Sequence, residues 1–209
     1  MRKTAAVLIA SFAVLCLSPA AWAASSVLGQ IEKKMESIHT LSADFIQTKH
    51  LAMFETPVEI TGTIHMEKPE KLAWKAKEPV KYTLVIDRDG IIRQDGQTGK
   101  TSRISIKDNP AMNTAVQQIK MWFSGEYAAL DQGYDIAVES ENPASIVFEP
   151  KPDNPAESML DRVSVRFRKD GRYISRIRIT EKGGDLTEIV FKNIKVNQKI
   201  PDSTWNPGK

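Results

Sequence analysis

Residues 58–67 read VEITGTIHME, and this segment has the clearest strand pattern of the sequence. Polar side chains alternate in it with apolar or small ones, which places one kind on each face of an extended chain. Pro69 ends the pattern, because proline cannot donate a hydrogen bond to a neighbouring strand. The apolar or small positions are Val58, Ile60, Gly62, Ile64 and Met66. The segment therefore predicts a strand with one face directed toward a core.

Similar strand patterns flank this segment on both sides. Turn sequences such as Gly96-Gln97-Thr98-Gly99 separate the strands, and the spacing is typical of strands joined by hairpins. On the N-terminal side the pattern covers residues 41–49, and on the C-terminal side it covers 72–75, 82–86, 91–94 and 101–106. These segments predict the first part of an antiparallel sheet.

A helical pattern interrupts the strands between residues 110 and 123. Asn109-Pro110 supplies a cap and a first-turn proline, and apolar residues then recur at helical spacing up to Ser124-Gly125. The strand patterns return at 134–138, 145–149, 162–168, 173–181 and 186–195. A second helix is expected near the N-terminus, where Ser25-Ser26 offers an N-cap and Val27, Leu28, Ile31, Met35 and Ile38 recur at helical spacing. About ten short strands with two helices predict a mainly β fold, a large antiparallel sheet that is curved or barrel-like. Such a sheet needs something to cover its apolar face.

The N-terminus has the organisation of a secretory signal peptide. Arg2 and Lys3 precede an apolar stretch, and the triplet 21–23 (AWA) has small residues where a signal peptidase requires them. We expect cleavage after Ala23, which makes residues 24–209 a single mature domain. Cys16 lies inside the apolar stretch after Leu15, where lipoprotein processing requires a small residue, so lipid anchoring there is not expected.

Cleavage would change what the composition implies. The chain contains 29 Lys and Arg residues against 26 Asp and Glu residues, and loss of Arg2 and Lys3 leaves it almost neutral. Its one cysteine is lost as well, which excludes disulfides, thiol nucleophiles and cysteine-bound metals from the mature domain. A nearly neutral chain gives no electrostatic reason to expect a nucleic-acid partner.

The mature sequence contains no pattern that indicates catalysis. His39, His50 and His65 fall in different elements without metal-binding spacing, and we expect them at the surface. A GxSxG nucleophile elbow and a glycine-rich phosphate loop are also missing from the sequence. The prediction is a protein that is not an enzyme and that uses neither a metal nor a cofactor.

Two segments contain more apolar side chains than the packing of the sheet requires. Met121, Trp122 and Phe123 are consecutive in the predicted helix, so they point in different directions. Either the helix packs deeply on the sheet with Trp122 filling a gap, which we favour, or it is an adaptable lid over an apolar cavity. The second segment, residues 51–54 (LAMF), would contact a membrane or partner if exposed, and we expect instead that Phe54 folds back onto the sheet.

The order and spacing of several short motifs resemble those of the periplasmic outer-membrane lipoprotein carrier proteins. The resemblance extends over most of the mature chain, and each motif by itself is degenerate. It rests on residues 42–48 (SADFIQT), 62–69 (GTIHMEKP), 72–74 (LAW), Pro79, 84–90 (LVIDRDG) and 197–205 (NQKIPDSTW).

This resemblance implies an unclosed half-barrel of about eleven antiparallel strands, with helices that form a lid over an apolar cavity. It also implies a monomeric periplasmic carrier that takes acyl chains of a lipoprotein or glycolipid from an inner-membrane donor to an outer-membrane acceptor. The residues expected in the cavity or lid are Phe45, Ile64, Lys68, Trp74, Leu84, Met112, Val116, Ile119, Trp122 and Phe123.

Lys68 departs from the family pattern. The carriers have an arginine before this proline, and it holds the lid closed through hydrogen bonds to backbone carbonyls. Lysine still donates hydrogen bonds but lacks the planar fork of arginine, so a latch built on Lys68 would be weaker. The departure leaves open a divergent relative that carries another amphiphile.

Three classes of function fit the resemblance to different degrees. A lipid-binding periplasmic chaperone is the leading hypothesis. The alternative is an interaction or sensor module, because the half-barrel also resembles domains that regulate envelope stress by binding proteins. An enzyme is the third class, known in the fold superfamily, but the sequence offers no converging catalytic groups for it.

Overall fold

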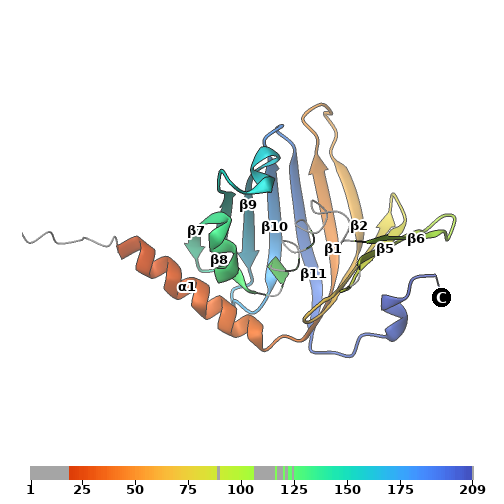
Figure 1. Cartoon of the computed structure of the whole chain (residues 1–209), viewed down its shortest axis with the longest axis horizontal. Helices are drawn as coiled ribbons and strands as arrows, with labels where there is room; N and C mark the ends of the chain where they lie inside the picture. Colours follow the sequence, from red (N-terminus) through yellow and green to blue (C-terminus); the bar gives the residue numbers. More distant parts are fainter. Residues whose placement is uncertain are drawn as a thin grey trace, which may run out of the picture.

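A curved antiparallel sheet forms most of the computed structural model (Figure 1). The structure describes residues 19–88, 90–105, 116, 120, 122–123 and 125–208. Within these residues the helix α1 covers Pro19–Glu36, and three short 3₁₀ helices are η1 (Tyr127–Gln132), η2 (Pro155–Ser158) and η3 (Asp202–Trp205). The helix predicted for 110–123 lies mostly outside the described residues, and Val116, Lys120, Trp122 and Phe123 are helical.

The described part of the chain forms one sheet of eleven strands, and the prediction of a large, unclosed antiparallel sheet is confirmed. The order across the sheet is β6-β5-β4-β3-β2-β1-β11-β10-β9-β8-β7, so β6 and β7 form two free edges. The bounds are β1 Thr40–His50, β2 Val58–Glu67, β3 Lys71–Glu78, β4 Tyr82–Ile86, β5 Gly90–Asp95, β6 Thr101–Ser105, β7 Tyr134–Glu141, β8 Ala144–Pro150, β9 Leu160–Phe167, β10 Ile174–Glu181 and β11 Leu186–Val196.

The first and last strands lie side by side in the middle of the sheet. Phe45 of β1 is paired with Phe191 of β11 on one side and with Gly62 of β2 on the other. Every other neighbouring pair of strands is consecutive in the sequence. The sheet is therefore two runs of hairpins that meet at the β1–β11 pairing.

Gly62 allows two aromatic rings to stack on the concave face of the sheet. The rings of Phe45 and Trp74 are stacked, with their centroids 3.8 Å apart. A Cβ atom at position 62 would lie 2.6 Å from Cζ of Phe45 and 2.1 Å from the backbone oxygen of Lys75. The glycine in the middle of this strand is thus required by the close approach of its neighbours.

Helix α1 closes one end of the core with its C-terminal half. Ile31 and Met35 of the helix, and Ile38 just after its end, are buried there with the apolar side chains of the sheet. The prediction that Ser25-Ser26 caps this helix is wrong, because α1 begins at Pro19 and both serines lie inside it. The alanine-rich residues before the serines favour helix themselves, so the helix does not start at the serines.

The loop between β1 and β2 is exposed, which corrects a second prediction. Phe54 does not fold back onto the sheet: 59% of its surface is accessible, and Met53 is 82% accessible. The β10–β11 turn lies against this loop, since Asp185 accepts a hydrogen bond from the backbone N–H of Ala52. Among the described residues, no helix has both the length and the hydropathy that crossing a bilayer requires.

Candidate functional site

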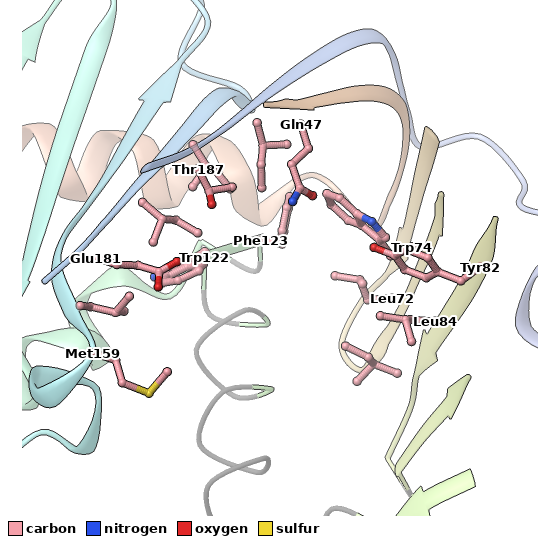
Figure 2. A pocket seen from close by; sticks show the side chains of 15 residues that line it. Gln47, Leu72, Trp74, Tyr82, Leu84, Trp122, Phe123, Met159, Glu181 and Thr187 are labelled. Carbon is pink, nitrogen blue, oxygen red and sulfur yellow. The ribbon is translucent and has the colours of Figure 1, made fainter. Parts of the chain in front are cut away.

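The concave side of the sheet encloses a cavity of about 470 Å³ (Figure 2). This size falls in the usual range for small-molecule sites, and most of the lining is apolar. In Figure 2, Trp122 and Met159 face Trp74, Leu72 and Leu84 across the open space. The lining residues are Gln47, Leu72, Trp74, Tyr82, Leu84, Ile86, Trp122, Phe123, Met159, Leu160, Ile177, Ile179, Glu181, Thr187 and Ile189.

Strand alternation explains why these side chains meet. Successive residues of a strand point to opposite faces, so every second residue of β3 and β4 faces the same space. Trp74 is paired with Leu84, and Leu72 with Ile86, which brings four apolar side chains together on one wall. On the other wall Ile177 and Ile179 of β10 have the same spacing of two.

Four of the ten residues expected in the cavity or lid line this cavity: Trp74, Leu84, Trp122 and Phe123. Phe45, Ile64 and Val116 are buried in the adjoining core and do not line it. Lys68 lies at the end of β2, away from the cavity and beside helix α1. Met112 and Ile119 lie outside the described residues.

Sequence reasoning missed the second wall of the cavity. Strands β9, β10 and β11 supply it through Leu160, Ile177, Ile179 and Ile189, among others. Their alternating patterns predict strands. Such a pattern does not show whether an apolar face packs against other side chains or lines an open cavity. The polar Gln47, two positions after Phe45 in β1, was detectable because the apolar face of this strand becomes polar there and continues with Lys49.

Lys68 connects the sheet to the end of helix α1. Its Nζ donates a hydrogen bond of 2.8 Å to the backbone carbonyl of Met35. The side chain is partly buried, and desolvation lowers the pKa of Lys68, opposed by the charges of Glu126 and Glu36. Carbonyls in the last turn of a helix lack partners within the helix, so a lysine is a suitable donor at this position.

Further contacts connect α1 to the segment that carries Trp122. The backbone N–H of Ala128 donates a 2.7 Å hydrogen bond to Oε1 of Glu32. The hydroxyl of Tyr127 donates to the backbone carbonyl of Trp122 at 2.8 Å and lies 3.4 Å from the sulfur of Met35. Tyr127 is fully buried, and desolvation raises its pKa. Lys68, Met35, Tyr127 and Trp122 therefore form a continuous series of contacts from β2 to the cavity.

The histidines do not contribute to the cavity. His39 and His50 are exposed as expected. His65 is not a surface residue: it is half-buried, and its Nδ1 lies 2.8 Å from Oγ of Ser42 on the neighbouring strand. Desolvation, helped by Lys75 and Lys77, lowers the pKa of His65. Among the described residues, no three His, Cys, Asp or Glu side chains are arranged so that they can hold a metal ion.

A family model described as "Outer membrane lipoprotein carrier protein LolA" matches residues 36–207, which is most of the chain. The chain belongs to this family. Outer-membrane lipoprotein carrier proteins of two species show how far the amino-acid sequences differ within the family. The protein of Pseudomonas putida strain GB-1 is 24% identical over 98% of this chain and 94% of its own length. That of Bordetella avium is 20% identical over 95% of this chain and 90% of its own.

Solved structures share the fold of this LolA-family chain at much lower identity. A DUF1329 family protein from Desulfovibrio piger has a TM-score of 0.50 and 11% identity, over 90% of this chain and 97% of its own. An uncharacterized conserved protein from Thermus thermophilus has a TM-score of 0.52 and 9% identity, over 87% of this chain and 96% of its own. At such identities the likeness concerns the fold alone.

Proposed function

We propose that this member of the carrier family binds acyl chains in its concave cavity and carries them through the periplasm toward the outer membrane. The observation that supports this most is the largely apolar cavity of about 470 Å³, formed in a chain that matches the family over residues 36–207. The cargo is a lipoprotein or another acylated amphiphile. An inner-membrane protein would donate it, an outer-membrane protein would accept it, and the carrier would act as a monomer.

Burial of an acyl chain supplies enough free energy for such a role. Each CH₂ group removed from water contributes about 0.8 kcal/mol, so one chain contributes on the order of 10 kcal/mol before any cost of opening the cavity. A carrier must also release its cargo, and an adaptable wall suits release better than a rigid one. Met159 lines the cavity and is 66% exposed. It can supply an adaptable part of the wall, because a thioether side chain adapts to different shapes.

Export follows from the N-terminal sequence in this proposal. Cleavage after Ala23 would leave a mature chain of residues 24–209, and most of helix α1 would remain. The buried helix positions Ile31 and Met35 lie in the part that remains, and the buried Ile38 follows it. The mature chain keeps the whole apolar end of the helix that packs on the sheet.

The carrier proposal is tested by the lipid content of the protein itself. The protein is purified from its own periplasm and analysed by native mass spectrometry, and an acylated molecule should travel with it in a 1:1 complex. The delipidated protein should then bind 1-oleoylglycerol with a change in tryptophan fluorescence, since Trp74 and Trp122 line the cavity. A protein that is empty when purified and that binds no acyl compound would contradict carriage and favour a protein-binding module.

We further propose that Lys68 latches α1 in its closed position through the carbonyl of Met35. Replacing Lys68 with methionine keeps the apolar stem and removes the donor, which should raise the dissociation rate of a bound acyl probe by about five- to tenfold. Stopped-flow displacement of the probe measures this rate. Lys33→Met, on the exposed face of α1, is the control and should leave the rate unchanged. Equal rates for the wild type and Lys68→Met would mean that the hydrogen bond does not act as a latch.

A further inference from the structure

Exposed apolar side chains gather at one end of the sheet. Among the described residues six large apolar side chains are exposed, and the sixth, Ile104, lies apart from the others on the edge strand β6. Single exposed apolar residues are common on protein surfaces, whereas a group of them marks a surface that contacts something. The other five, which we call the apolar rim, are Met53, Phe54, Val58, Val80 and Met159.

The strand pairings place the whole apolar rim at the same end. The chain turns there between β1 and β2, between β3 and β4, and between β10 and β11, because these neighbours are antiparallel. Val80 lies in the second of these turns. The first residue of β9 is paired with the last residue of β10, so Met159, which precedes β9, lies there as well. Figure 1 shows the β1–β2 loop, in orange, as the highest point of the sheet.

The apolar rim is continuous with the cavity. Met159 belongs to both, since it is exposed and also lines the cavity. Tyr82, the first residue of β4, and Glu181, the last residue of β10, line the cavity at this end too. Trp122 is buried and connected through Tyr127 to helix α1, at the opposite end. Within the described residues, the cavity is therefore accessible from the apolar rim.

Hydrogen bonds hold the β1–β2 loop in a form that directs its apolar side chains outward. The backbone N–H of Phe54 donates a 2.9 Å hydrogen bond to the carbonyl of Leu51, which closes a turn. Asp185 accepts a 2.8 Å hydrogen bond from the backbone N–H of Ala52, which ties the loop to the β10–β11 turn. A loop that is already ordered loses little conformational freedom when it docks. Met53 and Phe54 are thus prepared for contact with a partner.

The charges beside the apolar rim are paired with one another. Lys49 lies 3.6 Å from Glu181 and 3.9 Å from Asp185, and Lys182 forms an ion pair with Glu157. Residues 51–54 carry no charge. A partner held at this end is consequently held by the removal of apolar surface from water and not by electrostatic attraction.

We propose that the apolar rim docks on the surface of a lipid bilayer, so that acyl chains pass between the bilayer and the cavity without crossing water. The inference rests on the proposed acyl-chain binding and adds the surface with which the carrier meets a membrane. A chain that crossed water would expose its hydrocarbon, and an opening set against the bilayer avoids this cost. Glu55, which follows Phe54 and is exposed, disfavours anionic lipids, so the preferred surface is zwitterionic.

The test measures the binding of the delipidated mature protein to protein-free vesicles of phosphatidylcholine by flotation. The wild type should float with the vesicles. Phe54→Ser should lower the partition coefficient by about tenfold, the factor expected when one large apolar side chain no longer leaves water, and Met53→Ser should act in the same direction. Ile104→Ser is the matched control, because it removes an exposed apolar side chain outside the apolar rim, and it should keep the partition coefficient of the wild type.

Affinity in solution separates docking from cargo binding. Phe54 does not line the cavity, so Phe54→Ser should bind 1-oleoylglycerol as tightly as the wild type while it takes a fluorescent acyl probe from vesicles more slowly. A wild type that does not float overturns the proposal and assigns the apolar rim to a protein partner. Flotation that needs anionic lipid and disappears at high salt overturns it as well, as does an equal loss in Ile104→Ser. Vesicle binding without any binding of 1-oleoylglycerol overturns the carrier proposal instead.

Discussion

Replacing Leu84 with glutamate is expected to weaken the binding of 1-oleoylglycerol by at least about 100-fold. Leu84 faces the cavity from β4 and is paired with Trp74, so a carboxylate there would meet the hydrocarbon of the ligand. A charge that keeps its water prevents several CH₂ groups from leaving water, and four groups at about 0.8 kcal/mol each account for more than a hundredfold. Displacement of a fluorescent acyl probe measures the loss.

The same strand offers a matched control for this substitution. Thr83 is the preceding residue and points to the opposite face of the sheet, opposite Lys75 of β3. Thr83→Glu therefore introduces the same charge outside the cavity, beside a lysine that tolerates it. Ligand affinity should stay within about twofold of the wild type. If both variants bind equally well, the concave cavity does not hold the acyl chain.

The largest loss of stability is expected for Gly62→Ala. A Cβ atom would lie 2.1 Å from the backbone oxygen of Lys75 and 2.6 Å from the ring of Phe45, so both the β2–β3 pairing and the Phe45–Trp74 stack would have to move. Overpacking of this kind costs about 3 kcal/mol, which for a chain of this size lowers the melting temperature by about 6–12 °C. Thermal unfolding followed by circular dichroism measures it.

Gly183 supplies the control for this glycine. It lies in the turn between β10 and β11, and a Cβ atom added there would have no heavy atom within 4 Å. Gly183→Ala should change the free energy of unfolding by about 0.5 kcal/mol or less. A melting temperature of Gly62→Ala equal to that of Gly183→Ala would show that the sheet adjusts freely at the aromatic stack.

Local patterns were enough to predict the sheet. The alternation at residues 58–67 and the turns between segments depend on neighbours in the sequence, and β2 and β4 have the bounds expected from them. The start of α1 was missed because Ser25-Ser26 resembles a cap, while the preceding alanines extend the helix. Phe54 was misplaced because a residue pattern cannot show whether a loop has a core within reach.

The cavity was only partly predictable, for a physical reason. Trp74 and Leu84 alternate in phase with their strands, so a sheet of this kind places them on the concave side. Ile177 and Ile179 have the same phase, but whether they meet side chains or open space depends on the curvature of eleven strands together. The hydrogen bond from Lys68 to Met35 likewise joins a strand to a helix more than thirty residues earlier. No local pattern contains such a contact.

The pairing of β1 with β11 has a consequence for how the molecule assembles. Each run of hairpins forms from neighbouring segments, whereas this pairing closes a loop of nearly the whole chain and carries the corresponding entropic cost. Gln47 and Ile189, which line the cavity, are partners across it. We therefore expect the ligand-binding surface to be the last part of the chain to mature during folding. A chain that ends before residue 186 should form hairpins but no binding site.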